Sequence, residues 1–276
     1  MIVKEVFIMT DTEIRNICEV LKKLGLVTDD KLQSVYPNLY PKPVVPTTGY
    51  RTMTKHNCLI HIYETSNDEI VDVSLGIQNK LEKLSAIDDP NRIETCKINC
   101  GFFNFDGSKE HLGMYIDEGN IIEYPDNYYI NYLYFKDGHT DIAYYSGNPE
   151  EYLWWNKVLN WGIGVGYSLV KDGKIDLTNS KNFSHSTTDN PRTMIGQLAN
   201  GNFILAVADG RMTTSVGLTA AEQADIMLEL GCITAVNLDG GGSSEMIVNG
   251  KIVNKPSDGF ERSIGSAVLV YKKVGY

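Results

Sequence analysis

The sequence predicts an α+β fold, in which a strand-rich mixed sheet with packed helices follows an N-terminal helical appendage. Three features indicate this class: regularly spaced hairpin turns, one strongly capped helix in the last third of the chain, and a cluster of prolines near the start. We predict two units, residues 1–50 and residues 51–276. With 276 residues, 42% of them hydrophobic, the chain can bury a substantial core in the second unit.

The first unit has the pattern of one helix followed by a linker. Within residues 10–26 the apolar side chains recur at helical spacing, Asp11 or Thr12 can cap the start, and Gly25 lies where the helix should end. Residues 36–50 contain four of the nine prolines, a density that interrupts both helices and central strands. We therefore predict a separable helix and a semi-rigid linker.

The second unit shows strand patterns from Asn57 onward. Apolar and polar residues alternate, and short turn sequences separate the runs at 117–120, 137–138, 172–173, 200–201 and 249–250. These turns are Asp-Gly, Asn-Gly or similar pairs, which suit two-residue β-hairpins. The chain is therefore expected to be rich in hairpin-connected strands.

Residues 219–231 give the clearest helix prediction. Thr219 and Glu222 form a capping box, and Gly231 closes the helix. The segment lies between a strand that ends at Asp209 and a strand that ends at Asp239. A strand, a helix and a second strand in succession predict a right-handed crossover, which places both aspartates at one edge of the sheet, facing one pocket.

The segment NLDGGGSSE, residues 237–245, is the main candidate site. Three consecutive glycines indicate positive φ angles or a very close backbone approach. With Ser243 and Ser244, the exposed N–H groups of such a turn form a nest for an anion or a sugar hydroxyl. The alternative is an ordinary tight connection between two strands.

Other polar groups are candidates for contacts with a sugar phosphate. Arg192 and Arg211 stand at the ends of predicted strands, and a guanidinium group matches two phosphate oxygens. Asn99 and Asn104 follow another strand and can bond sugar hydroxyls, or alternatively hold a turn of their own backbone.

Composition limits the class of partner and the location. The net charge of -10 argues against binding along a nucleic-acid backbone, which usually needs a basic surface. No apolar run approaches the ~20 residues of a membrane span, and the start lacks a signal-peptide pattern. We expect a cytoplasmic or virion-associated protein. Its five cysteines are expected to be buried thiols, because no second cysteine or histidine pair completes a zinc set with Cys96 and Cys100.

Several motifs together resemble the phosphodiester glycosidase family. They are INCGFFN around Asn99, RTMIG from Arg192, VADGR around Asp209, GLTAAEQADIMLELG from Gly217, and VNLDGGGSSEMIVNG with the later SDGFER. The resemblance covers residues 57–271 and is strongest in the last third. Cys100 and Glu245 depart from the family pattern, and the stretch before Asn57 has no counterpart in it.

The resemblance implies a strand-rich catalytic domain that hydrolyses a sugar 1-phosphodiester, either a small molecule or a glycopolymer, and releases the sugar. Asp239 would meet the positive charge at the anomeric carbon, Asp209 would be a second carboxylate, and Glu245 is a further candidate. The implied substrate-binding residues are Arg211, Arg192, Asn99, Asn104, Asn237, Gly240, Gly241, Gly242, Ser243, Ser244 and Arg262. No cofactor is implied.

Two other classes stay open. A metal-dependent phosphodiesterase would use Asp209 and Asp239 as ligands of a divalent cation, although no His or Asp pair stands at ligand spacing. A glycan- or sugar-phosphate-binding module of a larger assembly, such as a phage particle, would keep the pocket for recognition alone. Sensitivity to a chelator separates the first class from a glycosidase, and turnover separates the second.

Overall fold

The computed structural model describes residues 11–28, 31–32, 35, 48–76, 80–104, 111–124, 128–144 and 146–273. The chain divides into two compact units, Met1–Pro46 and Thr47–Tyr276. Most of the predicted proline-rich linker lies outside the described residues, so its stiffness stays a prediction. Among the residues that are described, no helix is long and apolar enough to cross a membrane.

The predicted helix of the first unit is present as α1 (Asp11–Lys23). Gly25 has a φ of +69°, a left-handed conformation that glycine adopts without strain. Its N–H donates to Lys22 O at 2.9 Å, and Leu26 N–H donates to Leu21 O at 2.9 Å. These bonds satisfy carbonyls at the end of the helix, so the helix stops there as expected.

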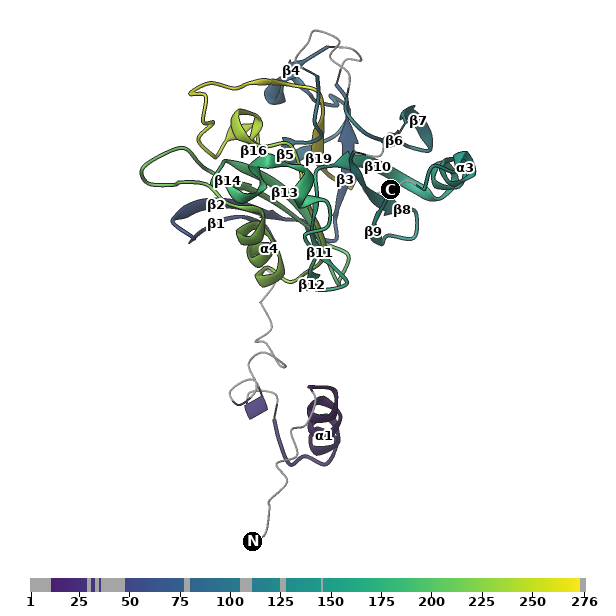
Figure 1. The fold of residues 1–276 in the computed structure, drawn as a ribbon, viewed down its shortest axis with the longest axis vertical. Coiled ribbons are helices and arrows are strands. Elements are labelled where there is room, and N and C mark those ends of the chain that lie inside the picture. Colours follow the sequence, from purple (N-terminus) through teal and green to yellow (C-terminus); the bar gives the residue numbers. More distant parts are fainter. Residues whose placement is uncertain are drawn as a thin grey trace. The chain divides into compact units, whose positions relative to one another are not determined.

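The described residues of the second unit form three large sheets and one small sheet (Figure 1). The seven-stranded sheet has the order β1 (Gly49–Lys55), β2 (Cys58–Glu64), β14 (Phe203–Ala208), β13 (Arg192–Leu198), β15 (Cys232–Asn237), β11 (Ser168–Lys171), β12 (Lys174–Ile175). One five-stranded sheet has the order β7 (Asn120–Glu123), β6 (Tyr115–Asp117), β10 (Leu159–Val165), β8 (Ile130–Phe135), β9 (Thr140–Ala143). The other has the order β17 (Lys251–Ile252), β16 (Met246–Val248), β5 (Glu94–Asn99), β19 (Ala267–Lys272), β3 (Glu69–Ser74). β18 (Ser263–Ile264) pairs with β4 (Glu82–Lys83).

All the strand pairs among the described residues are antiparallel, so the prediction of a mixed sheet is wrong, while the prediction of a strand-rich fold is confirmed. The error has a simple cause. The helix joins β14 to β15, but these strands are not neighbours, because β13 lies between them and pairs antiparallel with both. β14 and β15 therefore point the same way without sharing a hydrogen bond.

The five predicted hairpins are confirmed. They join β6 to β7, β8 to β9, β11 to β12, β13 to β14 and β16 to β17. At three of them both turn residues have positive φ, the geometry of a type I′ turn: Glu118 and Gly119, Asp172 and Gly173, Asn249 and Gly250. Local turn chemistry thus sets the pairing of consecutive strands.

Within the described part of the second unit, two α-helices pack on the sheets. The predicted helix is present as α4 (Ala220–Glu229), with the capping box between Thr219 and Glu222, and it packs on the seven-stranded sheet against β11 and β15 (Figure 1). The sequence did not predict α3 (Pro149–Val158), whose first turn is capped by the Asn148 side chain. Trp155 of α3 lies in a buried cluster with Leu133, Phe135 and other residues of the five-stranded sheet that contains β6, β8 and β10.

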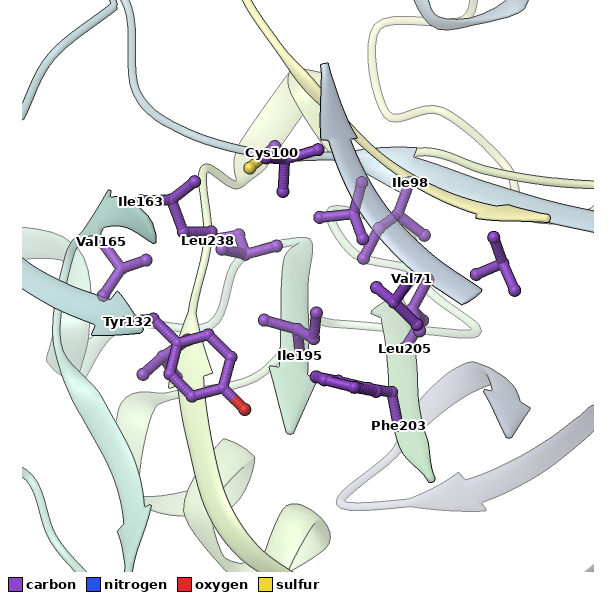
Figure 2. Close-up of a cluster of buried hydrophobic side chains, with 14 of the residues drawn as sticks. Val71, Ile98, Cys100, Tyr132, Ile163, Val165, Ile195, Phe203, Leu205 and Leu238 are labelled. Carbon is purple, nitrogen blue, oxygen red and sulfur yellow. The ribbon is translucent and has the colours of Figure 1, made fainter. Parts of the chain in front are cut away.

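β14 shows how the core positions the site. All six of its residues are buried, because both faces of the sheet are covered. One face of β14 packs into a central cluster shared by the three large sheets (Figure 2), and the other into the cluster under α4. Leu238 is also part of the central cluster, and it immediately precedes Asp239. The core thus anchors the loop that carries the candidate carboxylate.

Candidate active site

A cavity of about 260 Å³ lies where β13 begins and where β14 and β15 end. Because β14 and β15 point the same way, the loops after both strands meet at this edge, as predicted from the crossover. Arg192 is the first residue of β13 and is paired with Ala208, the last residue of β14. The cavity combines a carboxylate, arginines, a glycine turn and an aromatic wall.

Asp239 is the carboxylate that lines the cavity. Its position is fixed by the backbone, since Leu238 N–H donates to Thr193 O and Asp239 N–H donates to Cys100 O, both at 2.9 Å. Burial raises the pKa of Asp239 to about 6, against the opposing effects of hydrogen bonds from Ser243 and Gly240 and of the charge on Arg262. Near neutral pH the side chain is therefore mostly a carboxylate that changes charge readily.

The glycines are needed for close approach. Gly241 has a φ of +64°, and a Cβ on Gly242 would lie 2.1 Å from Arg262 Nη2 and 2.3 Å from Asp258 Oδ2. Larger residues would therefore collide with the side chains around the turn. This confirms the sequence interpretation that something lies tightly against the glycines, although the nearest groups are side chains of the protein itself.

The turn offers fewer open donors than the predicted anion nest needs. Three of its N–H groups are used within the protein, because Gly240 donates to Asp239 Oδ1, Gly241 donates to Pro191 O and Ser243 donates to Gly240 O. Ser243 and Ser244 are buried and do not line the cavity. The turn therefore shapes the cavity without offering a row of open donors.

Arg192 and Arg211 both reach the cavity, as predicted. Arg192 is buried, with Nε donating to Leu218 O at 2.8 Å and Nη2 donating to His185 O and Thr188 O. Arg211 is exposed, has a φ of +60°, and donates from Nη2 to Asn190 Oδ1 at 3.2 Å. Burial, together with the nearby Arg211 charge, lowers the pKa of Arg192.

The two arginines differ from Arg262 in how their charge is balanced. Arg262 also lines the cavity, but it forms a salt bridge with Asp258 at 2.6 Å. Among the described carboxylates, none forms a salt bridge with Arg192 or Arg211. The cavity consequently carries positive charge that an anionic ligand can neutralise.

Asn237 lines the cavity and is positioned by α4. Its Nδ2 donates to Gln223 Oε1 at 3.0 Å, and Gln223 Nε2 donates to the Tyr167 hydroxyl at 2.9 Å. Gln223 is fully buried, so the capped helix holds one amide and one phenol of the cavity in place. The most local of the sequence predictions, α4, therefore contributes directly to the site.

Asp209 does not line the cavity, which corrects the prediction of two aspartates in one pocket. Its Oδ1 accepts a hydrogen bond from Lys255 N at 2.9 Å, and its Oδ2 lies 3.5 Å from His61 Nε2. The next residue, Gly210, packs so closely on Pro191 that a Cβ there would lie 2.5 Å from Pro191 N. The chain turns at this contact, so Arg211 enters the cavity and Asp209 stays behind it.

Asn99 and Glu245 also lie outside the cavity lining. Asn99 is buried, its Nδ2 donates to Asp239 O at 2.7 Å, and its Oδ1 accepts from Thr193 Oγ1 and Glu245 N. It thus positions the Asp239 backbone, and the prediction of a direct sugar contact is wrong.

Glu245 is buried, and burial followed by the charge of Glu261 raises its pKa to about 8. Asn104 is half-buried and does not line the cavity.

Sequence reasoning missed the aromatic wall. Phe102, Tyr167 and Phe183 line the cavity, with ring centroids of Phe102 and Phe183 5.6 Å apart and those of Tyr167 and Phe183 5.8 Å apart. His185 and Asn190 also line the cavity. His185 lies in a short 3₁₀ turn (Ser184–Thr187) and Phe183 immediately precedes it in an extended conformation, and no spacing in the sequence marks either residue.

The placement of the carboxylates and cysteines can be compared with the geometry that a metal site needs. Asp209 and Asp239 do not share the cavity, so they are not placed as a pair of metal ligands. In the part of the chain that the structure describes, no group of three or more His, Cys, Asp or Glu side chains is arranged to hold a metal ion. All five cysteines are buried free thiols, and burial raises the pKa of Cys100 to about 12.

Fold and site define a strand-rich antiparallel protein with a small cavity lined by a carboxylate, arginines and aromatic rings. The chain belongs to the phosphodiester glycosidase family, whose sequence profile matches residues 94–271. The SPbeta prophage-derived uncharacterized protein YomE of Bacillus subtilis (strain 168) is 32% identical over 167 residues, which is 58% of this chain and 26% of YomE. Human N-acetylglucosamine-1-phosphodiester alpha-N-acetylglucosaminidase is 28% identical over 189 residues, which is 63% of this chain and 36% of that enzyme.

A solved structure has the same fold. The catalytic domain of zebrafish N-acetylglucosamine-1-phosphodiester alpha-N-acetylglucosaminidase, auto-inhibited by its pro-peptide, matches with a TM-score of 0.64 at 21% identity, covering 81% of each chain. The curated relatives are much longer than the matched region, since the chain spans about a quarter of YomE and about a third of the human enzyme. These matches establish the family and the fold of the second unit.

Proposed function

We propose that this chain is a hydrolase that cleaves a sugar 1-phosphodiester and releases the sugar from its phosphorylated acceptor. One observation carries the proposal: a single cavity presents the carboxylate of Asp239 together with Arg192 and Arg211, whose charges are not balanced by salt bridges with described carboxylates. A phosphodiester supplies the anion, and the sugar supplies the electrophilic carbon. Membership of the phosphodiester glycosidase family supports the same reaction class.

The arginines are suited to hold the phosphate. The Nε and Nη2 groups of Arg192 are fixed by three backbone carbonyls, so Nη1 remains to donate into the cavity. Arg211 approaches from the loop after β14 and keeps its Nη2 near the glycine turn and Asn190. A guanidinium group held in this way needs little reorganisation when the phosphate arrives.

Asp239 would act on the sugar. The bond between the anomeric carbon and the phosphate oxygen breaks, and its electron pair leaves with the phosphate. The anomeric carbon then carries positive charge, which a neighbouring carboxylate stabilises. Water supplies the new hydroxyl group, and its proton passes to the solvent or to the released phosphate monoester. The leaving group is the phosphate monoester of the acceptor, which departs readily, so a general acid contributes little and one carboxylate suffices.

A second candidate function is a sugar-phosphate-binding module of a phage assembly, with virion association as its setting. The similarity to prophage-derived YomE favours this setting. Such a module would use the same arginines and aromatic wall but would not turn over its ligand.

The test is a product assay on a panel of sugar 1-phosphodiesters in oxygen-18 water, with and without a chelator. Our proposal expects the label in the released sugar and activity that survives the chelator. Label in the phosphate would show attack at phosphorus and overturn it. Binding without turnover for every substrate that binds would instead support the module.

A further inference from the structure

The aromatic wall of the cavity continues onto the protein surface. Phe183 lines the cavity, and the Tyr128 ring centroid lies 5.2 Å from that of Phe183 and 5.1 Å from that of Tyr129. Tyr129 in turn lies 5.4 Å from Phe102, the other phenylalanine of the wall. We call these four residues the aromatic ledge. Tyr129 is buried and the two phenylalanines are half-buried, whereas Tyr128 is 49% exposed, so the ledge runs outward from the cavity.

Both the side-chain hydroxyl and the backbone carbonyl of Tyr128 form hydrogen bonds. Its hydroxyl donates to Asn182 O at 3.0 Å, and its backbone carbonyl accepts from Asn179 Nδ2 at 2.9 Å. Asn179 also donates to Gly166 O at 2.7 Å and has a φ of +70°, a conformation that asparagine tolerates better than most residues. An aromatic ring fixed in this way loses little conformational entropy when a ligand stacks on it.

The size of the cavity limits what fits inside. At about 260 Å³ it is slightly smaller than the usual range for ligand sites, about 300–1,000 Å³. The reacting sugar and its phosphate would fill it, so any further sugar ring must lie outside. Sugar rings have an apolar face of C–H groups, which packs on aromatic rings. The exposed Tyr128 ring adjoins the cavity through Phe183, so it offers such a surface next to the cavity.

We propose that Tyr128 and Phe183 form a second sugar-binding subsite next to the cavity. The substrate is accordingly an oligomeric or polymeric glycan phosphodiester, and a single glycosyl phosphate occupies only part of the site. This assignment rests on the proposed function for the role of the cavity. The subsite itself is a surface for a neutral sugar ring, and it can be tested without any turnover.

Tyr144 offers a matched control. It is a tyrosine of almost equal exposure, 50%, and among the described residues it shares no ring contact with the aromatic ledge. Tyr128→Ala should lower kcat/KM about 3- to 10-fold on an oligosaccharide phosphodiester, the range expected for loss of one stacking contact. It should leave a single-sugar phosphodiester with the same reacting group unaffected, and Tyr144→Ala should change neither. Equal losses on both substrates would overturn the proposal.

A binding assay separates this proposal from the proposed function. The probes are neutral trisaccharides of N-acetylglucosamine, glucose and galactose, titrated into the native protein by NMR. We expect at least one to shift resonances of the aromatic ledge, more weakly in Tyr128→Ala but nearly unchanged in Tyr128→Phe, which keeps the ring and loses the bond to Asn182 O. If no trisaccharide binds through Tyr128, the subsite is refuted even if hydrolysis is found. If a trisaccharide binds but no phosphodiester is cleaved, the subsite stands and the hydrolase proposal fails.

Discussion

An aspartate followed by a glycine comes directly after β14 and, with one intervening residue, after β15, yet only one of the two aspartates reaches the cavity. Asp209 is held behind the cavity by Lys255 N, whereas Asp239 faces into it and has a pKa raised to about 6 by burial. The two residues have the same local sequence signal, and the strands before them point the same way. Their difference comes from contacts with residues far away in the chain, and it predicts different consequences of mutation.

The largest expected effect is the contrast between Asp239→Asn and Asp209→Asn. Asp239→Asn removes the charge that meets the anomeric carbon, so we expect kcat to fall by about 100-fold or more, as for other groups that stabilise transition-state charge. The melting temperature of this variant at pH 7 should not fall below that of the native protein, because burial already disfavours the charged form of Asp239.

Asp209→Asn keeps an oxygen that can accept from Lys255 N, so most of the activity should remain. Asp209→Ala leaves that N–H without its partner and should lower the free energy of unfolding by about 1–3 kcal/mol. Denaturant unfolding and kcat measured on the same preparations separate the two roles. If Asp209→Asn lost as much kcat as Asp239→Asn, the assignment of Asp239 as the single carboxylate would be wrong.

The two arginines should differ in a similar way. Arg211 is exposed and makes one side-chain contact, so Arg211→Lys should raise KM about 10-fold by losing a charge-assisted hydrogen bond to phosphate, with stability unchanged. Arg192 also holds the carbonyls of Leu218, His185 and Thr188. Arg192→Lys should therefore raise KM and also lower the melting temperature. Equal melting temperatures for both variants would contradict the structural role of Arg192.

The raised pKa of Asp239 predicts a pH profile. If the carboxylate is the active form, kcat/KM should rise about tenfold per pH unit below about pH 6 and level off above it. The residual activity of the Asp239→Asn variant should not show this rise with pH. A profile that falls with rising pH through 6 would show that the protonated acid is the active form.

Glu245 should have a smaller effect, which concerns the stability of the folded protein. Its pKa is raised to about 8 in the folded protein, from an ordinary value of 4.5, because burial and then Glu261 disfavour its charge. The folded state therefore binds the proton more tightly, and Glu245 reduces stability progressively as the pH rises from about 4.5 to about 8. Glu245→Gln should unfold at a higher temperature than the native protein at pH 9, with a smaller difference at pH 5. The same difference at both pH values would show that ionisation of Glu245 is not the cause.

The sequence alone predicts the parts of the fold that depend on neighbours along the chain. The five hairpins and the capping box of Thr219 and Glu222 were correct because a few adjacent residues determine them. The shared edge of Asp209 and Asp239 was correct because a helix joins β14 to β15. The order of the strands in the sheet could not be predicted, since the position of β13 between β14 and β15 depends on long-range packing.

The candidate site was predictable to a smaller extent. Asp239, Arg192 and Arg211 were identified, because an aspartate beside three glycines and arginines at strand ends are unusual patterns. Asn99 was assigned to the substrate, although its amide holds the Asp239 backbone. Phe183 could not be found from the sequence, because it reaches the cavity as a single extended residue between two 3₁₀ turns, which have no periodic pattern.

The most direct test of the central claim is a crystal structure of the Asp239→Asn variant with an intact sugar 1-phosphodiester bound. We predict that the phosphate contacts Arg211 and Nη1 of Arg192, and that the anomeric carbon faces the side chain at position 239. A ligand whose phosphate lies away from both arginines, or whose anomeric carbon faces another carboxylate, would contradict the account.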